Sequence, residues 1–141
     1  MVVKGLVRNA DEAAAAESIL GYTCGNDVSA RDYQATDGQW TRAKGFDTFC
    51  PLGPWIETDL DPGALHIEGR VNGEVRQSAN TKELTFRPAF LVSYISKIMT
   101  LLPGDVIMTG TPAGVGPVEP GDTVEIEIEG IGVLTNPVAA R

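Results

Sequence analysis

The chain has 141 residues, of which 43% are hydrophobic and 21% are charged, values that are ordinary for a globular protein folded as one domain. Its net charge is −8 and no basic stretch interrupts the acidity, which argues against nucleic acids and anionic membrane surfaces as partners. Since the sequence has neither a signal-peptide pattern nor a long apolar run, we expect a cytoplasmic protein. An acidic chain can still bind an acidic metabolite, but only through a local group of cations.

The first part of the chain is predicted to contain two strands and one helix. Pattern and capping residues indicate a strand at residues 2–7, a helix at 9–20 and a strand at 22–27. Asn9 is the expected N-cap of the helix, and Glu12 completes a capping-box pattern.

A hairpin is predicted in the middle of the chain. Asn72-Gly73 lies between two strand-like runs, residues 65–71 and 74–79, and this dipeptide suits a turn in which both central residues have positive φ. The only histidine, His66, lies on the first run, where we expect it to face solvent.

The last part of the chain is predicted to add a helix and two strands. Pro88 begins a helix whose apolar positions continue as a buried stripe to Leu102. Residues 105–109 have the composition of a buried strand, and residues 122–129 alternate between apolar positions and a solvated row of glutamates. Short strands, two helices and regular Gly and Pro breaks together indicate a β-rich α+β fold.

Several chemistries are excluded by the residues available. One histidine and no Gly-x-Ser-x-Gly pattern argue against Ser-His-Asp and Cys-His hydrolases, and against a structural zinc site. Cys24 and Cys50 are interpreted as small core residues without a disulfide. The run from Gly110 to Gly116 lacks the Gly-Lys-Ser/Thr ending of a phosphate loop, which leaves a tight turn or an anion-binding loop around Thr111.

The stretch from Gly25 to Lys44 concentrates reactive side chains. Three carboxylates in this stretch suit a hard cation, namely Asp27, Asp32 and Asp37. Three further side chains suit a substrate anion, namely Arg31, Gln34 and Lys44. Asp27 ends a predicted strand, where a carboxylate is costly unless it is paired or binds a metal. The spacing leaves a structural alternative open, namely an Asp27–Arg31 ion pair with Asp32 capping a helix. Residues 46–56, after Lys44, are apolar and are expected to be buried.

Three blocks of sequence together resemble the fumarylacetoacetate hydrolase family. They are Asn26–Gln34, Lys44–Pro54 and Pro103–Gly116, and the ending from Gly121 to Gly132 fits as well. The blocks occur in the family's order and cover nearly the whole chain. The resemblance implies an α+β fold of the mixed β-roll type, in which sheets wrap around a central site.

The resemblance also implies a site and a chemistry. Asp27 matches the family aspartate that binds a divalent cation, Mg²⁺ or alternatively Mn²⁺ or Ca²⁺. The positions that hold the substrate's carboxylate and carbonyl oxygens are matched by Arg31, Gln34, Lys44, Gly110 and Thr111, with Lys44 as the catalytic cation. The implied reaction is hydrolysis of a C–C bond in acylpyruvates or related 2-oxo acids. Isomerases and decarboxylases of aromatic catabolism form a similar enolate, so these residues do not separate the three reactions.

The chain also departs from the family pattern. The family's Glu-x-Glu metal ligands precede a segment like Val2–Gly5, and its water-activating His and Glu lie further upstream, whereas this sequence starts at Met1. We therefore expect a chain that is truncated relative to the family and incomplete as a catalyst. Two classes stay open: a metal-dependent enzyme, or the remainder of one, and a non-catalytic binding or assembly domain. The resemblance suggests a homodimer.

Overall fold

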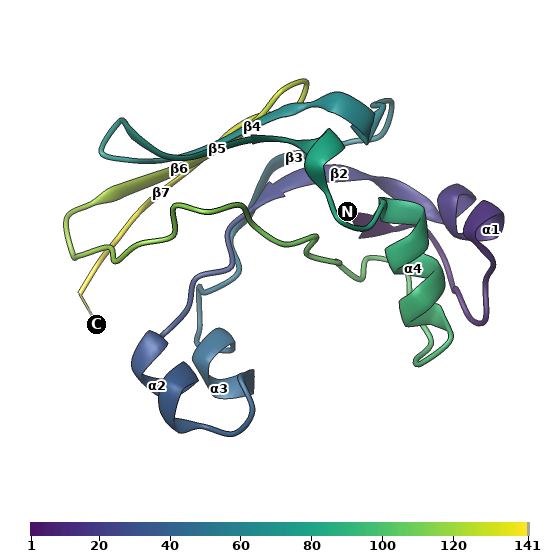
Figure 1. The fold of residues 1–141 in the computed structure, drawn as a ribbon, viewed down its shortest axis with the longest axis horizontal. Coiled ribbons are helices and arrows are strands. Elements are labelled where there is room, and N and C mark those ends of the chain that lie inside the picture. Colours follow the sequence, from purple (N-terminus) through teal and green to yellow (C-terminus); the bar gives the residue numbers. More distant parts are fainter. Residues whose placement is uncertain (141) are drawn as a thin grey trace.

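The computed structural model describes residues 1–140 and contains two antiparallel sheets and short helices, which confirms the predicted α+β class (Figure 1). The three-stranded sheet has the order β1-β2-β3, formed by Val2–Val3, Ile19–Gly25 and Leu52–Glu57. The four-stranded sheet has the order β5-β4-β6-β7, formed by Glu74–Asn80, His66–Val71, Thr123–Ile128 and Gly132–Pro137. The helices are α1 (Glu12–Glu17), α2 (Arg31–Thr36), α3 (Thr41–Lys44) and α4 (Pro88–Ser96), with 3₁₀ turns η1 (Pro62–Ala64) and η2 (Thr81–Glu83). None of the helices within the described residues has the length and apolar character that crossing a membrane requires.

The hairpin between β4 and β5 is confirmed. Asn72 and Gly73 both have positive φ, 52° and 79°, as the tight turn requires. His66 is exposed, and its Nε2 lies 3.9 Å from a carboxylate oxygen of Glu68. As predicted, the histidine faces solvent.

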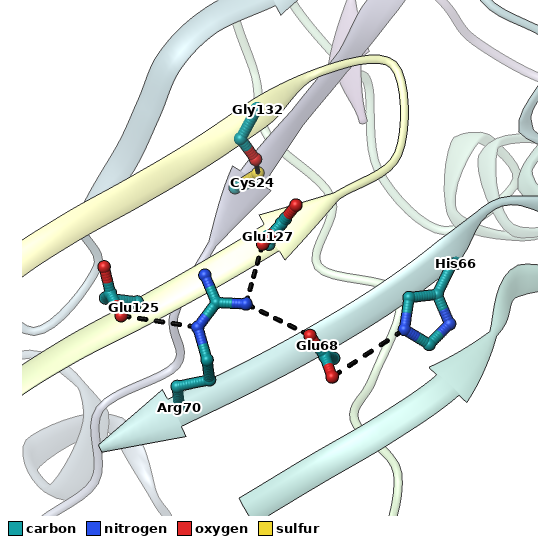
Figure 2. Close-up of polar contacts among 7 residues, drawn as sticks. All are labelled: Cys24, His66, Glu68, Arg70, Glu125, Glu127 and Gly132. Atoms are coloured by element: carbon teal, nitrogen blue, oxygen red, sulfur yellow. Dashed lines mark hydrogen bonds and ion pairs between the residues drawn. The ribbon is translucent and has the colours of Figure 1, made fainter. Parts of the chain in front are cut away.

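The glutamates of β6 do not form a purely solvated row. Arg70 on β4 donates hydrogen bonds to Glu127 at 2.7 Å, to Glu68 at 3.0 Å and to Glu125 at 3.3 Å, so one guanidinium joins two neighbouring strands (Figure 2). The hydrogen bonds to Glu127 and Glu125 hold the pKa of Arg70 above its usual value. The opposite face of β6 packs against the core through Ile126 and Ile128.

The interior consists of two apolar clusters. One joins β1, α1 and α4, through Met1, Val3, Val7, Ala15, Val92, Leu101 and Ile107. The other joins β2 to β7, through Cys24, Ile131 and Leu134. The thiol of Cys24 is fully buried and donates to the carbonyl of Gly132 at 3.4 Å (Figure 2). Cys50 is also a free thiol but it is exposed, so its prediction as a core residue is wrong.

The N-cap of helix α1 lies two residues later than predicted, and the helix ends earlier. Asp11 is its N-cap and accepts the N–H of Ala14 at 2.8 Å, so Asn9 is not the cap. The backbone of Asn9 is left-handed, with φ 52°, and its N–H donates to the carbonyl of Ser96. Because the chain turns after Glu17 to enter β2, the predicted helical residues up to 20 are divided between a helix and a strand.

Two predictions near α4 are wrong in extent. The helix ends at Ser96, and the predicted buried stripe leaves Tyr94, Ile98, Met99 and Leu102 exposed. Residues 105–109 do not form a regular strand. Val106 makes only an isolated bridge to Val2, although Ile107 is buried as expected.

Residues 26–51 form an arm that carries α2 and α3 away from both sheets (Figure 1). Backbone hydrogen bonds from Asn26 to Pro51 and from Val28 to Phe49 close its base, and Ala30 bonds to Ala43 further out. The segment at 46–56 was predicted to be buried, but Leu52, Trp55 and Ile56 are exposed. Burial here depends on what packs against β3, which is an edge strand of its sheet within residues 1–140, and a local sequence pattern does not show this.

Candidate functional site

A pocket of about 150 Å³ lies where the arm meets the four-stranded sheet and the loop after α4. Most of the predicted site residues line it together: Asp27, Arg31, Lys44, Gly110 and Thr111. The arm supplies the charged groups, whereas the loop supplies Gly110 and the hydroxyl of Thr111. The wall from the sheet includes Ile67, Gly69, Gln77 and Ile126.

The charged wall of the pocket is an ion pair. The ammonium of Lys44 donates to Oδ2 of Asp27 at 2.6 Å, and the side chains are 30% and 50% exposed. Asp27 follows the end of β2 and Lys44 ends α3, so the hydrogen bonds between the two sides of the arm bring them together. The structural alternative of an Asp27–Arg31 pair is therefore wrong.

Arg31 begins α2 and is fixed by a neighbour one turn away. Its Nη1 donates to Oε1 of Gln34 at 2.6 Å. Gln34 is not among the residues that line the pocket, so its contact with the pocket passes through Arg31. The N-cap of α2 is Ala30, without a side-chain hydrogen bond, so the predicted capping role of Asp32 is wrong.

The other two candidate carboxylates lie elsewhere on the arm. Asp37 accepts two hydrogen bonds from Arg42, at 2.6 and 2.8 Å, and the guanidinium of Arg42 also lies 4.1 Å from the ring centre of Tyr33. The hydrogen bond from Arg42 holds the pKa of Asp37 below its usual value. Asp32 is exposed in the first turn of α2. Neither carboxylate lines the pocket, so neither is placed to bind a metal ion together with Asp27.

The loop wall is held by a residue that the sequence did not single out. Nε2 of Gln77, on β5, donates to Oγ1 of Thr111 and to the carbonyl of Pro112, both at 2.8 Å. Gln77 also lines the pocket. Its position in an ordinary strand gave no signal, because a glutamine in an exposed hairpin strand is unremarkable by pattern.

Two larger pockets adjoin this one. The first, of about 440 Å³, is mainly apolar and shares Ile67, Gly110, Thr111 and Pro112 with it. The second, of about 610 Å³, lies between the base of the arm and the sheet and shares Asp27, Arg31 and Gln77. The small charged pocket thus lies between two larger pockets and shares residues with both.

The described residues do not complete a metal site by themselves. Within residues 1–140, no group of three or more His, Cys, Asp or Glu side chains is placed to hold an ion. Asp27 is the carboxylate of the arm that lines the pocket, and Lys44 already pairs with it. Glu68 on β4 also lines the pocket, but its carboxylate pairs with Arg70. Asp27 can therefore supply one ligand, and one carboxylate alone holds a divalent cation weakly.

The structure is thus an α+β domain with two carboxylates, Asp27 and Glu68, two cations, Arg31 and Lys44, and the hydroxyl of Thr111 on one pocket. Residues 1–139 match the model of the fumarylacetoacetate hydrolase C-terminal domain, and the chain belongs to this family. The family fold is thus confirmed.

Solved and curated relatives agree with this assignment. The chain is 61% identical to 5-carboxymethyl-2-hydroxymuconate delta-isomerase from Mycobacterium smegmatis, with a TM-score of 0.97 over 99% of this chain and 56% of that one. It is 37% identical to maleylpyruvate hydrolase from Sphingobium sp. SYK-6, solved with manganese(II) and pyruvate, with a TM-score of 0.88 over 98% of this chain and 51% of that one. It is also 48% identical to the mitochondrial oxaloacetate tautomerase Fahd2a of Rattus norvegicus, over 85% of this chain and 42% of that protein.

The chain spans only about half the length of several of these relatives, for example 54% of a Mycobacterium tuberculosis protein that is 59% identical to it. Their names indicate isomerase, hydrolase and tautomerase activities in one family, and one solved member holds a divalent cation together with pyruvate.

Proposed function

We propose that this chain is the catalytic-domain part of a divalent-cation-dependent enzyme that cleaves a C–C bond in acylpyruvates or related 2,4-dioxo acids. The observation that carries the proposal is the meeting of Asp27, Arg31, Lys44 and Thr111 on one pocket. Asp27 is this chain's ligand to the cation, Mg²⁺ or Mn²⁺. A relative solved with manganese(II) and pyruvate supports this choice of cation and substrate class.

The pocket residues suit a 2-oxo acid for physical reasons. Arg31 offers a planar fork that matches a carboxylate, whereas Lys44 is a compact charge that suits a single oxygen. In the proposed reaction, water adds to the 4-oxo carbon and the bond between C3 and C4 breaks. The electron pair of that bond becomes the enolate of pyruvate, which then takes up a proton, while the acyl group leaves as a carboxylic acid. Lys44 stabilises the negative charge on the enolate oxygen, and a preorganised donor of this kind contributes most when water is excluded.

A second reaction type is supported by the names of the relatives. Isomerisation, tautomerisation or decarboxylation of a 2-oxo acid passes through a similar enolate, and two of the relatives described above carry isomerase and tautomerase names. The same residues would bind the acid and stabilise the enolate. The two proposals are distinguished by product: hydrolysis of an acylpyruvate gives two acids, whereas the alternative leaves the carbon skeleton intact or releases CO₂.

We further propose that the chain forms a homodimer. Large apolar side chains are exposed just before, along and after α4, among them Phe86, Tyr94, Ile98 and Met99. The rings of Phe86, Phe90 and Tyr94 stack in a row, with centres 4.9 and 6.2 Å apart. Exposed apolar surface of this kind is typical of an interface. Sedimentation equilibrium of the wild type and of Ile98→Glu tests the proposal, since a dimer should dissociate in the variant.

The proposed function is tested by binding. Calorimetric titration with Mn²⁺, and then with pyruvate in the presence of Mn²⁺, should show saturable binding of both. Asp27→Asn should weaken Mn²⁺ binding about tenfold or more, because a carboxylate ligand is lost. Asp47→Asn is the matched control, since Asp47 is an exposed arm carboxylate that does not line the pocket. Mn²⁺ affinity that is equal in wild type and Asp27→Asn would contradict the proposal and favour a non-catalytic binding domain.

A further inference from the structure

The side chain of Gln77 reaches from β5 to the loop that carries Thr111. Its Nε2 donates to Oγ1 of Thr111 at 2.8 Å and to the carbonyl oxygen of Pro112 at 2.8 Å. A side-chain amide has two N–H hydrogens, so these two contacts use both of them. The loop wall of the pocket is therefore fixed to the sheet by one amide group.

The contact with Pro112 decides which way the amide points. A carbonyl oxygen can only accept a hydrogen bond, so the NH₂ group of Gln77 has to face it. The reversed amide would bring two acceptor oxygens together at the same distance. Gln77 is thus the donor and Thr111 the acceptor in their hydrogen bond.

This direction leaves the hydroxyl hydrogen of Thr111 free. A hydroxyl has one hydrogen to donate and two lone pairs that accept, and Gln77 occupies one lone pair. Thr111 is exposed and lines both the charged pocket and the apolar one, so the hydrogen is available to a ligand oxygen there. The hydroxyl is prepared to donate to an anion.

The neighbours of Gln77 leave room for this arrangement. Gly69 pairs with Gln77 across the hairpin, and a Cβ at Gly69 would lie only 3.2 Å from Oε1 of Gln77. Further along the loop, a Cβ at Gly114 would clash with the carbonyl oxygen of Arg76, so the loop lies directly on β5. Gly69 therefore leaves room for the side chain of Gln77, and Gly114 lets the loop lie close to β5.

We propose that Gln77 is a positioning residue that sets the Thr111 hydroxyl as a hydrogen-bond donor to a carboxylate or enolate oxygen of a bound 2-oxo acid. This inference rests on the proposed function. Gln77 itself does not touch the reacting atoms, and it acts by fixing the direction of the hydroxyl. Reversing the direction of the Gln77–Thr111 hydrogen bond should therefore weaken binding of the 2-oxo acid as much as removing the Thr111 hydroxyl does.

The first test reverses the hydrogen bond. In Gln77→Glu the carboxylate accepts from Thr111 and turns its hydrogen away from the pocket. Pyruvate affinity in the presence of Mn²⁺ should fall about ten- to a hundredfold, the range for one hydrogen bond to a charged group, and Thr111→Val should lose a similar factor. Because a carboxylate at position 77 adds a negative charge to the pocket whether or not the hydroxyl is present, the double variant uses Gln77→Leu. It should bind no more weakly than Thr111→Val alone, because the hydroxyl is already absent. Ser78→Ala, at the exposed neighbouring position of β5, is the control and should bind as wild type does.

A merely structural role for Gln77 predicts a different result. The losses in Gln77→Leu and Thr111→Val would then multiply in the double variant, and that outcome would overturn the inference. Unchanged pyruvate affinity in Gln77→Glu would overturn it as well.

The second test needs no ligand and separates this inference from the proposed function. In the wild type, both Nε2 protons of Gln77 should show NMR shifts typical of hydrogen bonding. Thr111→Val should move one of the two resonances and leave the other, which donates to Pro112, in place. If neither moves, the inference fails even where pyruvate binds. If one moves but wild-type protein does not bind pyruvate with Mn²⁺, it is the proposed function that fails, and the donor direction of Thr111 stands.

Discussion

The ammonium nitrogen of Lys44 lies 2.6 Å from Oδ2 of Asp27, although 17 positions separate the two residues in the sequence. Both side chains are partly exposed, so the pair contributes only about 0–1 kcal/mol to stability. Its main effect is on the pocket, where it places the ammonium of Lys44 beside Asp27, the carboxylate proposed to bind the metal ion.

Lys44→Ala should therefore affect binding and turnover far more than folding. We expect the melting temperature to fall by at most about 4 °C. In a protein that also carries the family's upstream Glu-x-Glu ligands, turnover of an acylpyruvate should fall about a hundred- to a thousandfold in Lys44→Ala, as for loss of one preorganised donor to an oxyanion. Lys44→Arg should restore only part of it, because a planar fork does not replace a compact ammonium. Steady-state kinetics and thermal unfolding check this, with Lys82→Ala as an exposed control; full activity in Lys44→Ala would leave Arg31 as the substrate cation.

Gly114→Ala should displace the loop that carries Thr111. The added Cβ would meet the carbonyl oxygen of Arg76, and the backbone at Gly114 has φ +106°, which side chains rarely adopt. We expect the free energy of unfolding to fall by about 1–3 kcal/mol and faster hydrogen exchange in the loop. Gly116→Ala is a matched control, because a Cβ there would meet nothing within 4 Å. Equal stability of the two variants in urea unfolding would contradict the close contact of the loop with β5.

The two thiols should differ in reactivity. Cys50 is exposed, whereas Cys24 is fully buried and burial raises the pKa of its thiol. Since the thiolate is the reactive form, we expect a thiol reagent to label Cys50 alone in the native protein and both cysteines after unfolding. Mass spectrometry of the labelled protein, with Cys50→Ser as the control, checks this. Rapid native labelling of Cys24 would mean that the cluster around Ile131 opens readily.

Stability should decrease in acid partly because of Asp122. Its carboxylate accepts the N–H of Glu119 and a side-chain N–H of Asn72, both at 2.8 Å, and these bonds hold its pKa below the usual 3.8. A lowered pKa in the folded state means that the stabilisation is present above pH 3.8 and is lost as the pH falls through the lower, folded value. Asp122→Asn should remove this component, so the difference in melting temperature from wild type should shrink below pH 3.8. A difference that stays constant down to pH 2 would contradict the assignment.

Where a local pattern decides the backbone, the sequence predicted the fold well. The turn at Asn72-Gly73 and the strand β6 depend on residues within the segment itself, and both are confirmed. The solvated row of glutamates predicted on β6 is wrong, because Glu125 and Glu127 are half-buried and bind Arg70 from the neighbouring strand. The start of α1 was wrong because Asp11 competes with Asn9 as the cap, and only the contact of Asn9 with Ser96 decides between them. The prediction that Cys50 is buried was wrong, because burial depends on which elements pack against a segment. The arm that carries Cys50 projects away from the sheets (Figure 1).

The site was predictable only in part. The resemblance identified Asp27, Lys44 and Thr111, and the structure places them on one pocket. The same resemblance gave Gln34 a substrate-binding role, which stays a prediction; in the structure its side-chain oxygen accepts from Arg31 and the residue does not line the pocket. Gln77 could not be predicted, because its contact with Thr111 joins a strand to a loop 34 positions away and has no local pattern.

The division of the pocket between the arm and the rest of the molecule has a mechanical consequence. Asp27, Arg31 and Lys44 all belong to the arm, whereas Gly110 and Thr111 belong to the loop after α4. A hinge movement at the base of the arm would carry the three charged groups as one unit, with the Lys44–Asp27 pair intact. The distance between these charges and the Thr111 hydroxyl, and with it the width of the pocket, would then change with the angle of the arm.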